Sequence, residues 1–248
     1  MGPAGKRRVL VTGGGRGLGA AIVTALAEAG HDVTFTFHAS AEAATVAANE
    51  LAAAHPQQSF AALRIDLADR DAVAAFTTAL GNDAPYSGFV HNAGHTYDAL
   101  AMMMDQAKAE VAMQVNYWAF TRIAGALARA MMRAKDGRIA VIGSVTALQA
   151  NQGNAAYAAS KGAIDSFTVG LGQEVAGEGI RVAAIRPGLI DTEIHASSGD
   201  PERAHRLAQT VPMKRVGNAE EIANAIVWLM SDEASYVTSA ILDVSGGR

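Results

Sequence analysis

Residues 8–19 read RVLVTGGGRGLG, and this stretch decides the fold because a short β-branched run passes directly into a glycine-rich turn. The run is typical of a buried strand, and the Ala- and Leu-rich residues 17–30 predict a helix behind it. Glycines between a strand and a helix let the backbone turn tightly and approach a pyrophosphate, whose charge then lies at the helix N-terminus. A plain strand–helix connection is the alternative, so the rest of the chain has to decide.

Short apolar runs and longer Ala-rich stretches alternate from this point to the C-terminus. Further strands are predicted for the segments DVTFTF, AALRID, SGFVHN, GRIAVIGS, IRVAAIRPG and AILDVSG. Further helices are predicted over 40–55, 69–80, 105–134, 155–178 and 218–231. Such alternation is typical of βαβ units, so we expect an α/β fold: a doubly wound, parallel, seven-stranded sheet (Rossmann fold) with helices on both faces.

The chain contains no internal repeat, low-complexity linker or block of like charge, so we expect a single domain over residues 1–248. Its least regular segment is 188–217, which follows Pro187 and contains the run SSGDP. A long connection past the carboxyl end of a late strand is where a doubly wound sheet places a substrate lid. We expect such a lid here, with an ordinary surface insertion as the alternative.

The composition of the chain, 50% hydrophobic and 18% charged, is that of an ordered protein with a large core. The net charge of -4 gives no electrostatic reason to expect a nucleic-acid partner. The absence of cysteine excludes disulfides and a cysteine nucleophile, and the histidines show no metal-binding spacing, so we expect no metal site. No uncharged apolar stretch approaches the ~18 residues that span a bilayer, so we expect no membrane association and a cytoplasmic location.

Five further motifs follow the glycine-rich turn. They are IDLAD with Asp66, NAG at 92–94, VNYWA with Asn116, IGSV with Ser144, and YAASK from Tyr157 to Lys161. Together with the turn's TGxxxGxG spacing and the segment PGLIDT at 187–192, they resemble the short-chain dehydrogenase/reductase family. The resemblance covers residues 7 to 247.

The resemblance implies a nicotinamide cofactor and a catalytic set. The implied cofactor contacts are Gly13, Gly15, Arg16, Gly17, Leu18, Gly19, Asp66, Leu67, Asn92, Ala93, Gly94, Tyr157, Lys161, Pro187, Gly188, Ile190 and Thr192. The implied catalytic set is Asn116, Ser144, Tyr157 and Lys161, in which Asn116 supports a water chain leading to the lysine. The role of His91, where the family more commonly has Asn, stays open.

Tyr157 and Lys161 also make chemical sense on their own. They stand four residues apart in a predicted helix, so both lie on one face of it. A phenol has a pKa of about 10, and a neighbouring ammonium that stabilises the phenolate makes it a usable acid or base. Ser144 offers a hydroxyl to a substrate oxygen on which charge develops. We therefore expect hydride transfer between nicotinamide and a carbonyl or alcohol, with Tyr157 as the proton donor or acceptor.

The end of the second predicted strand bears on the choice of cofactor. It reads TFHAS at 36–40, without the acidic residue that bonds a ribose 2′-hydroxyl and repels a 2′-phosphate. Asp32 lies at the start of that strand, too far away to replace it. Arg16, His38 and Ser40 can instead receive a phosphate, so we predict NADP(H) in preference to NAD(H).

The substrate is less strongly indicated. Among short-chain reductases, residues 213–239 are most similar to the 3-oxoacyl-carrier-protein reductase group. Docking an acidic carrier protein needs a basic patch near the site entrance, which we expect from Arg129, Arg133, Lys135 and Arg138. Glu178 counts against a carrier, because relatives that use one usually have a basic residue there.

Two other functions stay open: a dehydrogenase of a sugar, polyol or cyclic alcohol, and a cofactor-binding sensor or scaffold without catalysis. The intact set of Ser144, Tyr157 and Lys161 argues against the second of these. The resemblance also implies a homotetramer built from helices 105–134 and 155–178 and from the C-terminal region. That region contains Asn224, Ile226, Trp228 and Tyr236.

Overall fold

The computed structural model describes residues 6–191 and 207–248, and its centre is one sheet of seven parallel strands. The strands lie in the order β3-β2-β1-β4-β5-β6-β7, which confirms the predicted doubly wound Rossmann fold. Their bounds are β1 Arg8–Thr12, β2 Asp32–Phe37, β3 Phe60–Arg64, β4 Gly88–His91, β5 Gly137–Ile142, β6 Ile180–Pro187 and β7 Ala240–Val244. The central strands are buried and apolar because both faces of the sheet are covered.

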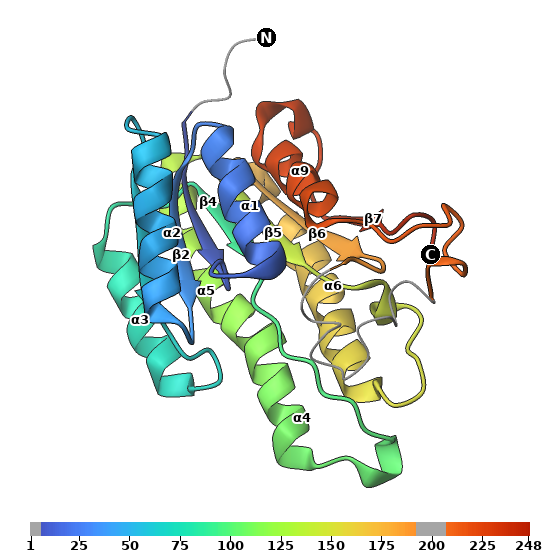
Figure 1. Ribbon diagram of the computed structural model, residues 1–248. Helices are drawn as coiled ribbons and strands as arrows, with labels where there is room; N and C mark the ends of the chain where they lie inside the picture. The colour runs from blue at the N-terminus through green and yellow to red at the C-terminus, as the bar shows by residue number, and fades with distance from the viewer. Residues whose placement is uncertain (1–5, 192–206) are drawn as a thin grey trace.

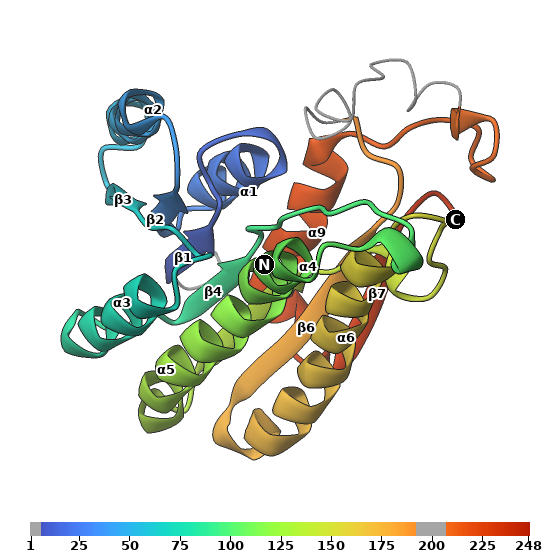
Figure 2. The same cartoon turned by 90° about the horizontal axis from the view of Figure 1, so that it is seen from below.

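Helices cover both faces (Figures 1 and 2). One face carries α1 (Gly17–Glu28), α2 (Ala41–Ala54) and α9 (Ala219–Met230). The other carries α3 (Arg70–Asn82), α5 (Ala119–Ala134) and α6 (Ala155–Val175). Each face has its own apolar cluster, with Phe35 and Ile226 in the first and Phe89 and Ile164 in the second, all four fully buried.

The helix predicted over 105–134 forms, but it is not an α-helix throughout. It consists of α4 (Gln106–Met113), a π-helical turn η2 (Gln114–Trp118) and α5. A π-helical turn inserts one extra residue into a helix and is frequent at functional sites. Here it carries Asn116, which is fully buried. The remaining short turns are η1 (Ala101–Met103), η3 (Val145–Ala147), η4 (Ala176–Glu178) and η5 (Asp232–Ala234).

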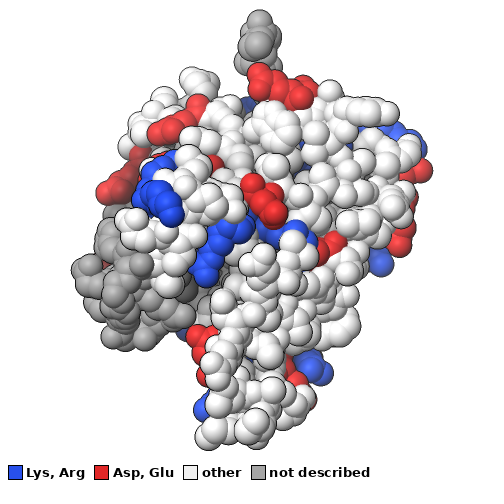
Figure 3. All heavy atoms as spheres, turned by 90° about the vertical axis from the view of Figure 1, so that its right-hand side faces the viewer, with Lys and Arg blue, Asp and Glu red and all other residues white. Residues whose placement is uncertain are grey.

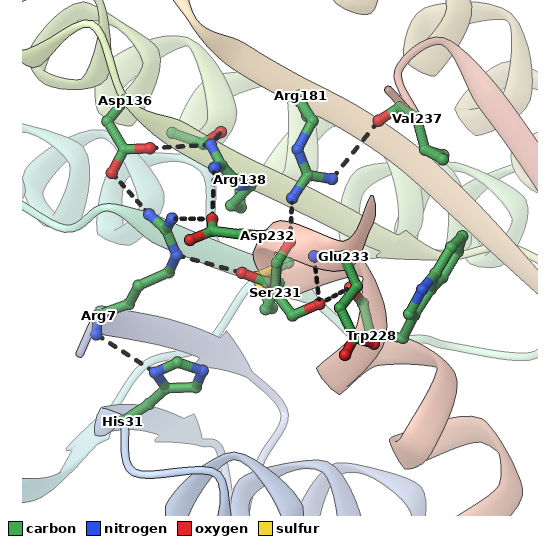
Figure 4. Close-up of polar contacts among 12 residues, drawn as sticks. Arg7, His31, Asp136, Arg138, Arg181, Trp228, Ser231, Asp232, Glu233 and Val237 are labelled. Carbon is green, nitrogen blue, oxygen red and sulfur yellow. Dashed lines mark hydrogen bonds and ion pairs between the residues drawn. The ribbon is translucent and has the colours of Figure 1, made fainter. Parts of the chain in front are cut away.

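An arginine cluster, consisting of Arg7, Asp136, Arg138, Arg181 and Asp232, lies at the amino ends of β1, β5 and β6 (Figure 4). Arg7 contacts the two aspartates at 2.6 and 3.3 Å, and Arg138 contacts the same two at 2.9 and 3.2 Å. Arg7 and Arg181 also donate to backbone carbonyls at the C-terminal end of α9, at 3.1 and 2.7 Å. Cations stabilise a helix C-terminus, so the cluster anchors α9 to the sheet.

The surface carries no dominant charge in the view of Figure 3, where acidic and basic side chains are intermixed on a mostly uncharged face. Of the helices in the described part of the chain, none is long and apolar enough to cross a bilayer. Within residues 6–191 and 207–248, no group of three or more His, Cys, Asp or Glu side chains could hold a metal ion.

Candidate active site

The motifs of the sequence meet at one edge of the sheet, where the parallel strands end. The glycine-rich turn follows β1, the NAG turn follows β4, and Ser144 follows β5. Gly188 follows β6. The turns after β1 and β4 lie at the point where the strand order reverses, which is where open α/β sheets bind ligands. We call this the carboxyl edge, and the end with the arginine cluster the amino edge.

The glycine-rich turn has the form of a phosphate cradle. Gly13 has a φ of +69°, which glycine adopts without strain. A Cβ on Gly19 would overlap the Gly13 carbonyl and lie 2.6 Å from Asn92 Nδ2. The side chain of Arg16, at the N-cap of α1, makes no capping hydrogen bond, which leaves first-turn N–H groups for an anionic ligand. A dinucleotide pyrophosphate therefore fits this turn.

Thr12 ties the glycine-rich turn to the NAG turn and defines the state of His91. Its hydroxyl oxygen accepts from the backbone N–H groups of Asn92 and Ala93, at 3.2 and 3.3 Å. Its own hydrogen is then free for His91 Nδ1, which lies 2.9 Å away. His91 is fully buried, and burial together with the charge of Lys161 lowers its pKa to about 3. His91 is thus a neutral structural link. If Thr12 donates to Nδ1, the ring proton is on Nε2, which has no hydrogen-bond partner among the described residues.

Asn116 holds the loop after the NAG turn against α6. Its Oδ1 accepts from the backbone N–H of His95 at 2.7 Å, and its Nδ2 donates to the His95 carbonyl at 3.0 Å. Nδ2 also donates to Ser160 Oγ at 2.8 Å, and Ser160 in turn donates to the Tyr157 carbonyl at 2.7 Å. Asn116 therefore positions the start of α6 through contacts within the protein. Ser160, which sequence reasoning missed, stands inside the YAASK motif.

Ser144 caps the short turn η3. Its Oγ accepts from Thr146 N at 3.2 Å and lies 2.8 Å from Thr146 Oγ1, which is placed to donate to it. A hydrogen bond with Ser144 also lowers the pKa of Tyr157. The three hydroxyl groups therefore form one polar group at the carboxyl edge. Thr146 was not expected from the sequence, although its hydroxyl stands only two residues after Ser144.

Tyr157 is partly buried at the N-terminal end of α6, and its environment differs from the expectation. Burial raises the pKa of Tyr157. The hydrogen bond of Ser144 lowers this pKa, and the negative charge of Asp98 raises it further, so the overall shift is upward. The expected lowering by Lys161 does not occur in this structure, since the pKa of Tyr157 is raised and Lys161 does not offset the effect of burial. The lysine Nζ lies 5.8 Å from the centre of the phenol ring. Nζ donates instead to the Ile142 carbonyl at 2.8 Å. Tyr157 is therefore protonated at neutral pH.

Lys161 is 2% exposed, and burial lowers its pKa to about 8. The charge of Asp165, one helical turn further along, opposes this loss of charge. Asp165 is itself held by Arg186, whose Nε and Nη2 lie 2.9 and 2.8 Å from Oδ2. Because Arg186 directly precedes Pro187, this buried ion pair ties α6 to the end of β6. No motif in the sequence predicts the pair.

The adenine end of the expected cofactor site lies at the ends of β2 and β3. Asp66 Oδ1 accepts from Ala68 N at 2.9 Å, and its other oxygen lies 3.6 Å from His38 Nε2. Arg64 Nε donates to the His38 carbonyl at 3.3 Å, which adds a cation that sequence reasoning missed. Ser40 has a φ of +63° and makes no capping bond to α2, so its hydroxyl stays available.

The other expected cofactor contacts of this region are placed as follows. Leu67 is 7% exposed, and its carbonyl accepts from the side chain of Gln114 at 3.2 Å. Asp32, which was not expected to contact the cofactor, lies at the start of β2 as predicted, and its Oδ1 is 2.9 Å from Lys6 Nζ. Ile190 pairs with Gly217, so the two ends of the segment predicted as a lid lie side by side. Thr192 and the residues of that segment from 192 to 206 lie outside the described residues.

The predicted basic patch does not border this site within one chain. Arg129 and Arg133 lie in the last turns of α5, and Lys135 and Arg138 flank the start of β5, so all four lie toward the amino edge. Arg138 belongs to the arginine cluster, and Lys135 forms an ion pair with Glu178. The expectation of a patch near the site entrance is therefore wrong within one chain. Arg138 lies at the start of β5, at the amino edge, whereas Ser144 follows the other end of β5, at the carboxyl edge.

Comparisons with known proteins show what the chain as a whole is similar to. A family model described as enoyl-(acyl carrier protein) reductase matches residues 13–248. The chain is 39% identical to an uncharacterised oxidoreductase, YgfF, of Escherichia coli K12 (96% of this chain, 98% of that protein). It is 37% identical to the 3-oxoacyl-[acyl-carrier-protein] reductase FabG of the same strain (96% and 95%).

A similar solved structure is that of a proposed NAD(P)-dependent gluconate 5-dehydrogenase from Beutenbergia cavernae with NADP bound at low occupancy. It is 34% identical, with a TM-score of 0.91, and the match covers 99% of this chain and 98% of that one. Levodione reductase is 28% identical, with a TM-score of 0.88 and 97% and 96% coverage. On its sequence, its fold and the arrangement of its carboxyl edge, the chain belongs to the short-chain dehydrogenase/reductase family of nicotinamide-dependent oxidoreductases.

Proposed function

We propose that the chain is an NADP(H)-dependent oxidoreductase that interconverts a carbonyl and an alcohol, with Tyr157 as general acid and base. The observation that carries this proposal is the convergence of Ser144, Tyr157 and Lys161 beside a glycine-rich turn shaped for a pyrophosphate. A bound nicotinamide would supply or accept the hydride. The protein's own task is then to position the substrate oxygen and to move one proton.

The raised pKa of Tyr157 favours its role as a proton donor in carbonyl reduction. At neutral pH the phenol keeps its proton and can pass it to the substrate oxygen as negative charge develops there. Ser144 donates a second hydrogen bond to the same oxygen. Lys161 supports proton transfer by its positive charge. Because its pKa is about 8, it carries this charge at neutral pH.

Three groups support NADP(H) over NAD(H). Arg16 at the start of α1 is exposed, so its guanidinium is available to a 2′-phosphate. His38 and Arg64 lie together at the ends of β2 and β3, close to the uncapped hydroxyl of Ser40. Asp66 is the opposing charge, 3.6 Å from His38, and it matches the position that contacts adenine in the family.

Two substrate classes are open to this site. The similarity to 3-oxoacyl-[acyl-carrier-protein] reductases supports a 3-oxoacyl thioester. Glu178 stands where relatives that use a carrier usually have a basic residue, which disfavours a carrier-bound form of that substrate. The likeness to a proposed gluconate 5-dehydrogenase supports the second candidate, a sugar, polyol or cyclic alcohol.

The experiment follows oxidation of NADPH and NADH by absorbance, with acetoacetyl-CoA first and then a panel of ketones, sugars and polyols. We expect turnover with at least one substrate, faster with NADPH. The Arg16→Ala variant should raise the KM for NADPH while leaving that for NADH unchanged. Equal use of both cofactors would contradict the cofactor assignment. Quenching of tryptophan fluorescence by NADPH without turnover of any substrate would favour a sensor instead.

We also propose a homotetramer, on the grounds of large apolar side chains at the surface. Trp118 on the π-helical turn is 46% exposed, Trp228 on α9 is 36% exposed, and Tyr236 is fully exposed. Ile226, which the sequence suggested for the same contact, is fully buried in the core and cannot take part. Light scattering coupled to size-exclusion chromatography should give four chains, and a monomer would reject the proposal.

A further inference from the structure

The hydroxyl of Ser144 has both of its acceptor positions occupied by a single neighbouring residue. Thr146 donates to Ser144 Oγ through its backbone N–H at 3.2 Å, and its side-chain Oγ1 lies 2.8 Å from the same atom. A hydroxyl oxygen has two lone pairs and carries one hydrogen. If Thr146 Oγ1 donates as well, only the hydrogen of Ser144 is left, and it has to point away from Thr146.

The direction of this hydroxyl pair decides what a substrate meets. The substrate oxygen gains negative charge during reduction, so it needs hydrogen-bond donors around it. If Ser144 donated to Thr146 instead, it would present a lone pair to that oxygen and repel it. With Thr146 as the donor, the hydrogen of Ser144 points away from Thr146, and the hydrogen bond that lowers the pKa of Tyr157 places it on the side of the Tyr157 hydroxyl. The accepted hydrogen bonds also polarise the Ser144 hydroxyl and strengthen its own donation.

We propose that Thr146 is a positioning residue for carbonyl reduction, which fixes Ser144 as a hydrogen-bond donor to the substrate oxygen. The inference rests on the proposed function, since it assigns Thr146 a task only if Ser144 serves the reaction. Thr146 itself touches neither cofactor nor reacting atoms in this account, and it acts only through Ser144. Valine has nearly the same shape as threonine but cannot donate, so Thr146→Val removes one hydrogen bond and little else.

The experiment measures kcat and KM for the best substrate of the panel at saturating NADPH. The variants are Thr146→Val, Thr146→Ser, Ser144→Ala and the double variant Ser144→Ala/Thr146→Val. We expect Thr146→Val to lower kcat by about 10-fold with little change in KM, since one hydrogen bond to a catalytic donor is lost. Thr146→Ser keeps the hydroxyl and should restore most of kcat. NADPH affinity, followed by tryptophan fluorescence, should not change in either variant.

The double variant separates positioning from a general structural effect. If Thr146 acts through Ser144, Thr146→Val should have no further effect on kcat in the Ser144→Ala background. Thr78→Val on α3 is the matched control, because Thr78 Oγ1 donates to a helix carbonyl at 3.0 Å, far along the chain from the site. It should keep wild-type kcat.

The outcomes distinguish this inference from the proposed function. Two outcomes overturn the inference alone. One is an equal loss of kcat from Thr146→Val in the wild-type and Ser144→Ala backgrounds. The other is an unchanged kcat in Thr146→Val while Ser144→Ala and Tyr157→Phe have lost activity. Wild-type activity in Ser144→Ala and Tyr157→Phe overturns the proposed function, and the inference with it. A loss that Thr146→Ser restores and that vanishes in the Ser144→Ala background supports both.

Discussion

The two edges of the sheet use buried polar groups in opposite ways. At the amino edge, three arginines make ion pairs with aspartates or donate to carbonyls at the end of α9. At the carboxyl edge, Lys161 and His91 are buried and Tyr157 is partly buried, none with a carboxylate in contact, and the pKa of each is displaced from its ordinary value. Asp136 and Asp232 are both paired at the amino edge, whereas no carboxylate contacts the three ionisable groups of the carboxyl edge. The amino edge is not fully satisfied: among the described residues Arg138 Nε and Arg181 Nε have no hydrogen-bond partner, and burial lowers the pKa of Arg181 to about 10.

This difference separates stability from chemistry. Paired and hydrogen-bonded charges fix the relative positions of strands and helix but have little left to offer a ligand. Buried groups without a counter-charge cost stability and are held in the protonation state that a reaction needs. Substitutions at the amino edge should therefore change stability with little effect on turnover, and substitutions at the carboxyl edge should do the reverse.

A large effect is expected from Lys161→Met, which removes the buried cation and keeps most of the length of the side chain. Turnover should fall by about 10²-fold or more, in the range that proton-transfer groups contribute. In the wild type, Lys161 loses its charge as the pH rises through about 8, so the rate of reduction should decline above that pH. The measurement is the pH dependence of kcat in both proteins.

Lys161→Met should lack the decline near pH 8, and a decline that persists would assign it to another group. Lys108→Met on exposed α4 is the matched control and should behave as the wild type.

Arg7→Met tests the amino edge. It removes the hydrogen bonds of Arg7 to Asp136, Asp232 and the end of α9 while keeping an apolar stem in the buried site. We expect the free energy of unfolding to fall by about 2 kcal/mol and the Tm by about 4–8 °C, measured by circular dichroism. kcat should stay within twofold of the wild type. A large loss of kcat at unchanged Tm would contradict the separation of the two edges.

His91→Asn should change how stability depends on pH. The pKa of His91 is about 3 in the folded chain and 6.5 in the reference state, so the unfolded chain binds one more proton between these values. Stability contributed by the neutral ring is therefore present above pH 6.5 and is lost as the pH falls toward 3. Urea unfolding from pH 4 to 6 should show a slope about 1.4 kcal/mol per pH unit shallower in the variant. Equal slopes would reject the assignment of a neutral buried ring.

The smallest effect is expected from the exposed ion pair of Lys135 and Glu178. Lys135→Ala should change the free energy of unfolding by less than about 0.5 kcal/mol, because solvent screens such pairs. Turnover of acetoacetyl-CoA should be unchanged. Glu178→Arg should speed up reduction of a carrier-bound thioester if the loss of a basic residue is what disfavours it; no change would remove that argument.

Much of the fold could be predicted from the sequence, because strand and helix periods alternate cleanly and glycines mark the first turn. All seven strands form where apolar runs end in glycine, proline or polar residues. The π-helical turn at Gln114–Trp118 could not be predicted, since one inserted residue leaves helix propensities unchanged. The position of the basic residues could also have been predicted. Arg138 lies at the start of a predicted strand that ends just before Ser144, so the two residues have to lie at opposite ends of that strand.

Which residues lie together in the candidate site could be predicted from the sequence, but their pKa values could not. The spacing of Tyr157 and Lys161 gives a shared helix face, but it does not say where the lysine Nζ points. The structure directs it to the Ile142 carbonyl, and burial then raises the pKa of the phenol. Thr146 and Arg186 escaped notice because their partners are set by a loop turn and by packing between α6 and β6.

The most direct test of the central claim compares wild type with Tyr157→Phe in NADPH-dependent reduction of the best substrate, with NADPH affinity measured by tryptophan fluorescence. The account predicts a fall in kcat of about 10²- to 10⁴-fold at unchanged NADPH affinity and unchanged Tm, because the phenol proton alone is removed. Turnover within a few-fold of the wild type would contradict the account, since the carboxyl edge would then not carry the chemistry through Tyr157.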